Sequence, residues 1–130
     1  MDDESIISVA GQYFAQQAGD LIAAYVFGSV ARRTSGPSSD VDVAVLFAVP
    51  PAPTLAGLPL ETEAELEQLL GRPVQVVVLN DAPVDFIHRV LRDGALVHET
   101  DRAARVNFEV AARREYLDLL PVLRRYRKAA

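Results

Sequence analysis

Cysteine is absent from this 130-residue sequence, and histidine occurs only twice, as His88 and His98. Without cysteine the chain can form no disulfide bond, thiolate nucleophile or cysteine-ligated zinc site. Two histidines are too few for a histidine-rich metal centre. No apolar run reaches the roughly 18 residues that a membrane span requires, and residues 1–4 are acidic where a secretory signal would be basic. We therefore expect a soluble cytoplasmic protein.

The length and the charge narrow the function classes further. A chain of 130 residues, 50% hydrophobic, is enough for one folded domain over residues 1–130. Its net charge of −5 disfavours direct binding of nucleic acid. The charge is uneven, because residues 1–100 hold 14 acidic and 5 basic side chains, whereas residues 101–130 hold 4 and 8. The basic segment is either a solvated helix face or a surface that meets an acidic partner.

Helical and strand-like patterns alternate along the chain, which predicts an α/β fold. Apolar residues at helical spacing predict helices over residues 4–18, 60–70, 83–92 and about 101–128. Short apolar runs predict strands over residues 21–27, 40–47, 74–79 and 95–99. Asp81 and Asp101 are expected to cap the two helices that follow them, and Pro121 is expected to kink or interrupt the last helix.

Two aspartates stand at the start of the second predicted strand, Asp40 and Asp42. Side chains at positions i and i+2 of a strand share one face, and two carboxylates about 5 Å apart repel by about 3 kcal/mol at an effective dielectric near 20. A divalent cation would convert this repulsion into a ligand set, and oxygen ligands suit Mg²⁺, which takes the rest of its shell from water and substrate phosphates. The alternative is that both acids flank a turn and face solvent.

A second polar motif ends the first predicted strand, at Gly28 and Ser29, with Arg32 one turn later. Glycine allows a ligand close to the backbone, and the amides and hydroxyl that follow can donate to an anion. The Arg32 guanidinium could contact a phosphate with two hydrogen bonds. By itself this motif is typical of any strand-to-helix turn. Together with the aspartates it predicts a phosphate cradle beside a metal-ligand pair.

Residues 26–32 (VFGSVAR) and 39–45 (SDVDVAV), with ten residues between Gly28-Ser29 and Asp40, resemble the signature of the minimal nucleotidyltransferases of the DNA polymerase β-like superfamily. The resemblance continues more loosely through residues 73–80, 90–99 and 114–118. It implies a small mixed sheet flanked by helices, with a long C-terminal helix. It also implies Asp40 and Asp42 as catalytic metal ligands, and nucleotide contacts from the residues around them, Gly28, Ser29, Arg32 and Ser39.

The resemblance also implies a function. Small members of this family use Mg²⁺ and ATP and are typically antitoxins paired with a HEPN-domain ribonuclease toxin. Some of them neutralise that toxin by transferring AMP to one of its tyrosines. For this chain we therefore expect a protein adenylyltransferase in a hetero-oligomer with a HEPN toxin, with the helix over about 101–128 as the partner-binding element and with homodimerisation left open.

Two positions depart from the family pattern. Gln75 stands where many members carry a third carboxylate on the next strand, and Arg33 stands where many carry glycine. Glutamine cannot act as a general base, whose contribution is typically 10²–10⁴ in rate. The alternative is therefore a catalytically weak or inactive antitoxin that masks the toxin by binding. A third interpretation, transfer to a small molecule, would need an acceptor pocket for which little chain remains.

The remaining polar candidates have plainer interpretations. His88 lies within an apolar helical pattern and is expected to be a surface or packed histidine, and His98 is expected to decorate a strand edge. Asp85 is typical of the first turn of a helix, where the macrodipole stabilises an acid. Tyrosines and arginines of the last helix, including Tyr116 and Tyr126, could anchor a partner.

Overall fold

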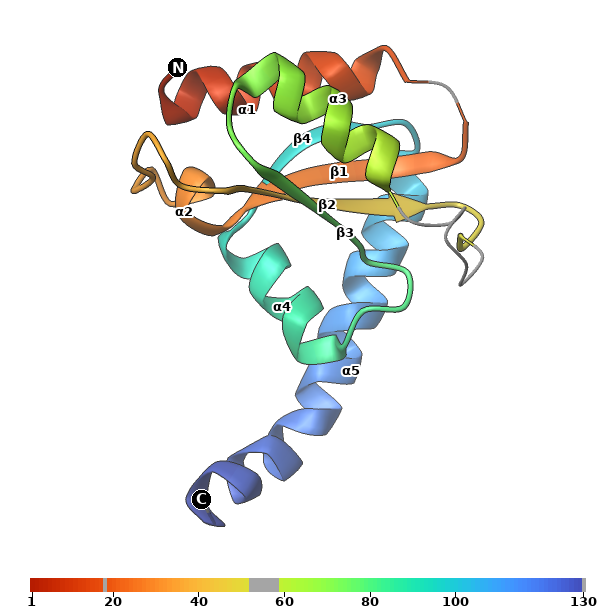
Figure 1. The fold of residues 1–130 in the computed structure, drawn as a ribbon. Helices are drawn as coiled ribbons and strands as arrows, with labels where there is room; N and C mark the ends of the chain where they lie inside the picture. Colours follow the sequence, from red (N-terminus) through yellow and green to blue (C-terminus); the bar gives the residue numbers. More distant parts are fainter. Residues whose placement is uncertain (18, 52–58, 130) are drawn as a thin grey trace.

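The computed structural model describes residues 1–17, 19–51 and 59–129, which form a four-stranded mixed sheet with helices on both faces (Figure 1). The elements follow one another in the order α1 (Asp3–Ala15), β1 (Leu21–Phe27), α2 (Gly28–Ala31), β2 (Val41–Phe47), α3 (Leu60–Leu70), β3 (Val74–Val78), α4 (Val84–Asp93), β4 (Ala95–Glu99) and α5 (Arg102–Ala129). The α/β fold with a small mixed sheet and a long C-terminal helix is confirmed.

The strands lie in the order β3-β2-β1-β4. β1 pairs antiparallel with both β2 and β4, whereas β2 and β3 are parallel and are joined through α3. The antiparallel pairing brings the end of β1 to the beginning of β2, with Phe27 opposite Asp42. The parallel pairing places Gln75 of β3 opposite Asp42 on its other side. One end of the sheet thus brings together the Gly28-Ser29 motif, the aspartate pair and Gln75, the residue that departs from the family pattern.

Two apolar clusters hold the layers together. On one face, α1 and α3 cover the side chains of alternate strand residues such as Val26, Val43 and Val76. On the other face, α4 and α5 cover a second set that includes Tyr25, Ala44 and Leu79. Because successive side chains of a strand point to opposite faces, Asp42 lies on the second face, the one that α4 covers.

Helix α1 is joined to its surroundings by polar contacts at both ends. Asp2 caps it, since the carboxylate accepts a hydrogen bond from the Ser5 amide at 2.8 Å. Near its other end the Tyr13 hydroxyl donates to Glu65 of α3 at 2.5 Å. Burial, together with this hydrogen bond, raises the pKa of Tyr13 to about 12. The bond therefore links the two helices on this face throughout the physiological pH range.

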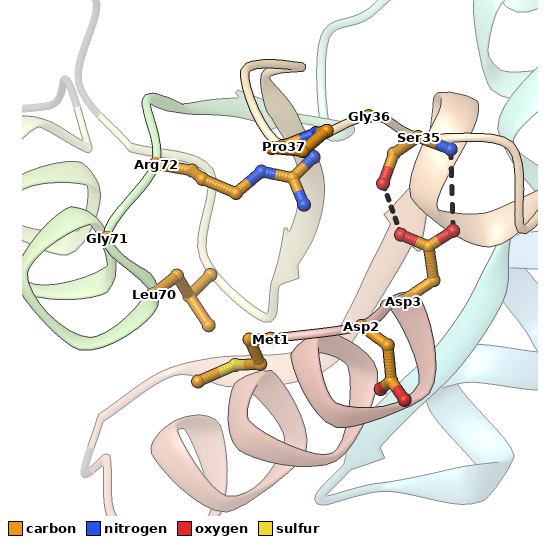
Figure 2. Close-up of a pocket in the computed structure, with 9 residues that line it drawn as sticks. All are labelled: Met1, Asp2, Asp3, Ser35, Gly36, Pro37, Leu70, Gly71 and Arg72. Carbon is orange, nitrogen blue, oxygen red and sulfur yellow. Dashed lines mark hydrogen bonds between the residues drawn. The ribbon is translucent and has the colours of Figure 1, made fainter.

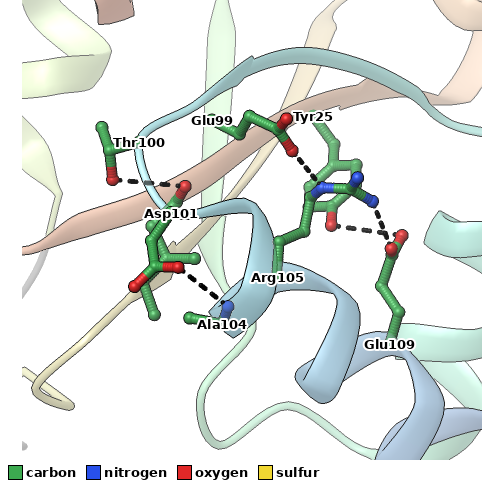
Figure 3. Close-up of polar contacts among 8 residues, drawn as sticks. Tyr25, Glu99, Thr100, Asp101, Ala104, Arg105 and Glu109 are labelled. Carbon is green, nitrogen blue, oxygen red and sulfur yellow. Dashed lines mark hydrogen bonds and ion pairs between the residues drawn. The ribbon is translucent and has the colours of Figure 1, made fainter.

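Polar contacts join the first turns of helix α5 to the sheet. Arg105 pairs with Glu99 at the end of β4 and with Glu109 one turn later, and Glu109 accepts a hydrogen bond from the Tyr25 hydroxyl at 3.5 Å (Figure 3). Asp101 caps the helix as predicted, accepting from the Ala104 amide at 3.0 Å. Burial beside Glu109 raises the pKa of Tyr25. Farther along, α5 packs against α4, and its C-terminal part extends away from the body of the molecule (Figure 1).

Several predicted boundaries were wrong for local reasons. Asp81 does not cap α4, because Pro83 stands at the capping position and the helix begins at Val84. Pro121 does not interrupt α5, which continues to Ala129. A proline inside a helix typically costs about 3 kcal/mol, and α5 continues through Pro121 in spite of that cost. The first helix ends at Ala15, earlier than the predicted residue 18, and residue 18 lies outside the described part of the chain.

Candidate functional site

The two predicted motifs meet at the end of β1. Gly28 begins the single turn of α2 with a left-handed backbone, φ 71°. A Cβ atom built on Gly28 would lie 2.3 Å from Oδ2 of Asp42, well inside van der Waals contact. Only glycine combines this backbone conformation with room for the carboxylate. Gly28-Ser29 is therefore more than a strand-to-helix turn, since the Asp42 carboxylate packs directly against Gly28.

The two aspartates act on each other electrostatically. Asp40 is exposed and lies one residue before β2, and Asp42 is partly buried within it. Burial raises the pKa of Asp42, the negative charge of Asp40 raises it further, and Arg32 opposes the shift. Among the described residues neither carboxylate accepts a hydrogen bond or joins an ion pair. The charge of Arg32 is thus the compensation that the described residues offer, and it leaves the pKa of Asp42 raised.

Such a pair fits a divalent cation that is held mainly by its substrate. Within the described ranges no group of three His, Cys, Asp or Glu residues could enclose a metal ion, so a closed protein site of the zinc or calcium type does not match these side chains. Mg²⁺ is commonly bound by one or two carboxylates together with water and substrate phosphates. The donor set of Asp40 and Asp42 meets that requirement.

Ser29 and Arg32 lie on and just after the short helix that follows Gly28. The Ser29 carbonyl accepts from the Thr34 amide at 2.9 Å, and no described residue bonds its partly buried hydroxyl. Arg32 caps α2 through its backbone amide, and its side chain is exposed. Its charge opposes the rise in the pKa of Asp42, and it adds to the lowering of the pKa of Asp93 that the hydrogen bond from Arg92 causes, so the guanidinium lies in the field of two carboxylates.

The loop that carries Ser39 is held from both sides. At its start Ser35 bonds to the Asp3 carboxylate. At its end the Ser39 hydroxyl accepts from the Gly36 amide at 2.9 Å. Nε of Arg72 donates to the Ser39 carbonyl, also at 2.9 Å. Asp3, Ser35, Gly36 and Arg72 border a pocket of about 380 Å³ (Figure 2), which Ser39 itself does not line. The Ser39 hydroxyl is therefore engaged in a hydrogen bond within its own loop.

Arg72 is the residue that the sequence did not single out. It is buried, 8% exposed, and its Nη2 atom has no hydrogen-bond partner among the described residues. Its neighbour Pro73 accepts a hydrogen bond from the Val41 amide at 2.8 Å. The segment before β3 is therefore hydrogen-bonded to the residues on both sides of Asp40. The only signal in the sequence was an arginine between a helix-ending glycine and an apolar strand.

The two departures from the family pattern occupy informative places. Arg33 has φ 60° and is the one non-glycine residue with positive φ in the described part of the chain. The loop thus has at position 33 the left-handed backbone that favours glycine. Its side chain bonds Glu4 at 2.6 Å and the Ala31 carbonyl. Gln75 is exposed and pairs in register with Asp42 on the same face. A carboxylate at position 75 would thus join the pair.

The other sequence candidates lie away from this corner or play structural parts. His88 stacks on Tyr116 of α5, with ring centroids 3.6 Å apart, which confirms a packed histidine. His98 lies on edge strand β4 opposite Ala24, as predicted. Asp85 lies in the first turn of α4, as expected for a residue that the helix macrodipole stabilises.

Comparisons with known proteins agree with this geometry. A family model described as polymerase beta, nucleotidyltransferase matches residues 10–103. No curated protein matches the chain significantly. No helix in the described ranges has both the length and the apolar character needed to cross a bilayer.

Solved structures resemble the whole chain. One, a toxin–antitoxin with AMP-PNP, is 23% identical with a TM-score of 0.78, and the match covers 99% of this chain and 98% of the other. A tri-AMPylated Shewanella oneidensis HEPN toxin in complex with MNT antitoxin matches at 20% identity, TM-score 0.74, and coverage of 98% and 97%. The toxin–antitoxin MntA-HepT matches at 19% identity with a TM-score of 0.63, and the match covers 95% of this chain and 97% of the other. At these identities the likeness establishes the fold.

Proposed function

The chain belongs to the polymerase beta nucleotidyltransferase family, and we propose that it is the antitoxin of a HEPN toxin, to which it transfers AMP from ATP with Mg²⁺. The observation that carries the proposal is the contact between Gly28 and the Asp42 carboxylate, with Asp40 close enough to raise the pKa of Asp42. The structural neighbours described as toxin–antitoxin complexes, one with AMP-PNP, support the choice of partner and nucleotide.

The proposed roles follow from the positions of the side chains. Asp40 and Asp42 would hold Mg²⁺, which would neutralise charge on the phosphates as the α-phosphoryl group is transferred. Ser29 and the amides after Gly28 would donate hydrogen bonds to phosphate oxygens. An acceptor hydroxyl oxygen would form a bond to the α-phosphorus, the bond to the β-phosphate would break, and pyrophosphate would leave. The hydroxyl proton would pass to solvent, since Gln75 cannot accept it.

Helix α5 is the proposed partner-binding element. It carries several exposed apolar side chains, among them Leu117 at 64% and Tyr126 at 79% exposed. An amphipathic helix with apolar residues left in water is typical of an interface. Leu117→Asp is therefore expected to weaken toxin binding, and Val49→Asp, at a loop position 61% exposed, is the matched control. Equal binding by the two variants would exclude α5 as the binding element.

The direct test is transfer of label from ATP. The purified chain, labelled ATP, Mg²⁺ and the HEPN protein encoded beside it are incubated, and label is expected on the HEPN protein. Asp40→Asn/Asp42→Asn is expected to abolish labelling. Asp20→Asn/Asp81→Asn, which changes the net charge equally at two exposed positions, is expected to retain it. Undiminished labelling by the first variant would show that the site is elsewhere.

A second candidate function is favoured by Gln75. Its register position beside Asp42 leaves the site without a third carboxylate, so the chain could neutralise the toxin by binding alone. Toxin neutralisation in cells separates the two functions. If Asp40→Asn/Asp42→Asn protects as well as the wild type, masking suffices, and if protection is lost while complex formation persists, transfer is required.

A further inference from the structure

A second pocket, of about 250 Å³, opens beside Gly28 between α2 and α4. We call it the arginine pocket, because three of its eight lining residues are arginines and only one is acidic; the lining residues are Phe27, Gly28, Arg32, Phe86, Arg89, Val90, Arg92 and Asp93. The pocket is thus positively charged in a chain whose net charge is −5. Such a concentration of guanidinium groups is typical of sites that bind anions.

The three arginines differ in whether a neighbouring carboxylate already neutralises their charge. Arg92 donates to both carboxylate oxygens of Asp93, at 3.0 and 2.8 Å. Arg32 and Arg89 form no ion pair within the described residues. Arg32 belongs to the motif already described, whereas Arg89 comes from α4, a helix outside that motif. Arg89 therefore brings a positive charge that no described contact neutralises.

Aromatic contacts place Arg89 relative to the carboxylate pair. Its guanidinium carbon lies 5.7 Å from the centroid of the Phe86 ring. That ring packs edge-on against Phe27, with centroids 5.6 Å apart and an angle of 90° between the ring planes. Phe27 is the register partner of Asp42 and precedes Gly28. A guanidinium resting on an aromatic face is partly ordered before any ligand arrives, so less entropy is lost when it binds one.

We propose that the arginine pocket receives the β- and γ-phosphates of the nucleotide, and that Arg89 binds them. This inference rests on the proposed function, because it assumes that the α-phosphate lies at Asp40 and Asp42. Gly28 separates the two halves of the site, with the Asp42 carboxylate against it and the pocket beside it. A polyphosphate carries one negative charge or more per phosphate group and matches guanidinium forks, whereas a nucleobase would leave those charges unpaired.

The test uses calorimetry with Mg²⁺ and two ligands, AMP-PNP, which has β- and γ-phosphates, and AMP, which has neither. Arg89 is exposed, so Arg89→Gln is expected to fold normally. We expect it to weaken AMP-PNP binding about tenfold or more, the effect of losing one charge-assisted hydrogen bond, and to leave AMP binding unchanged. Arg102→Gln makes the same charge change on the exposed first residue of α5 and is expected to bind both ligands like the wild type.

Three outcomes would contradict the inference in distinguishable ways. Equal losses for AMP-PNP and AMP would place Arg89 at the nucleoside. An unchanged affinity of Arg89→Gln for AMP-PNP would exclude Arg89 while leaving the proposed function intact. Failure of the wild-type chain to bind any nucleotide would overturn the proposed function and this inference together.

Discussion

Replacing Gly28 by alanine tests whether the close contact with Asp42 matters, and the chain offers a matched control in Gly71. The two glycines have nearly the same backbone, φ 71° and φ 69°. A Cβ atom on Gly71 would meet nothing within 4 Å, whereas one on Gly28 would lie 2.3 Å from the Asp42 carboxylate. Gly71→Ala therefore reports the cost of the backbone alone, and Gly28→Ala reports that cost together with displacement of the carboxylate.

The magnitudes follow from these geometries. A left-handed backbone costs alanine about 1–2 kcal/mol, partly offset by about 0.4–1 kcal/mol because alanine restricts the unfolded chain. We expect Gly71→Ala to lower the free energy of unfolding by about 1 kcal/mol. In Gly28→Ala the Asp42 side chain must also rotate away, which costs a further 0.5–1.5 kcal/mol or so. The fold should survive both substitutions.

The binding measurements should separate the two variants clearly. With its carboxylate displaced, Asp42 no longer faces the position proposed for the metal, and we expect Gly28→Ala to bind AMP-PNP with Mg²⁺ at least about tenfold more weakly, as for other changes that reorient a metal ligand. Gly71→Ala should bind it like the wild type. Thermal denaturation and calorimetry on the same samples give both quantities. If the two variants bind AMP-PNP equally well, the contact at Gly28 has no part in the site.

Other substitutions test the remaining features of the structure. Gln75→Asp should raise the rate of AMP transfer, by up to the 10²–10⁴ typical of a general base, measured as label incorporated into the partner. No gain would refute the argument that a carboxylate beside Asp42 can act as the general base. Arg72→Met should leave the Ser39 carbonyl unbonded and speed amide hydrogen exchange in residues 34–40, measured by mass spectrometry; an unchanged rate would show that Arg72 does not hold the loop. The folded-state pKa of Tyr13, about 12, lies above its ordinary value of 10. Its contribution to stability is therefore complete below pH 10 and is lost as the pH rises through 12. Tyr13→Phe should lose less stability over that window in alkaline unfolding, and an identical pH profile would contradict the link between α1 and α3.

The strands and helices could be predicted because each carries its own local signal. The alternation of Asp42 and Ala44 with buried valines on β2 is visible without any knowledge of the fold, and Asp101 is a local cap that the structure keeps. Asp81 failed as a cap because Pro83 determines where α4 begins. At Pro121 the local rule predicted a kink or an interruption, and the helix is not interrupted there. A local capping rule thus fails where a neighbouring proline determines the start of the helix.

The sequence predicted that the Gly28 and Asp42 motifs would lie together, but it did not predict the contacts that hold the surrounding loop. The spacing of Gly28 and Asp42 suggested that the two strand ends meet, and the antiparallel register brings them into contact. Arg72 lies 33 residues from Ser39 in sequence, and only the packing of the segment before β3 shows that it holds that loop. Arg89 likewise belongs to a helix whose pattern reveals only its apolar face. Contacts between distant segments depend on tertiary packing, which leaves no periodic pattern in the sequence.

Gln75 joins the electrostatics of the site to the nature of the acceptor. The pKa of Asp42 is already raised by burial and by Asp40, and a third carboxylate in register beside it would add to that repulsion. Glutamine avoids this cost, and in the proposed transfer reaction it would leave the site without a base. Transfer would then depend on an acceptor that ionises readily, and a tyrosine hydroxyl, with a pKa near 10, loses its proton far more easily than an aliphatic hydroxyl does. A site with two carboxylates and a glutamine is therefore better matched to a tyrosine on a protein partner than to the hydroxyl of a sugar or a serine.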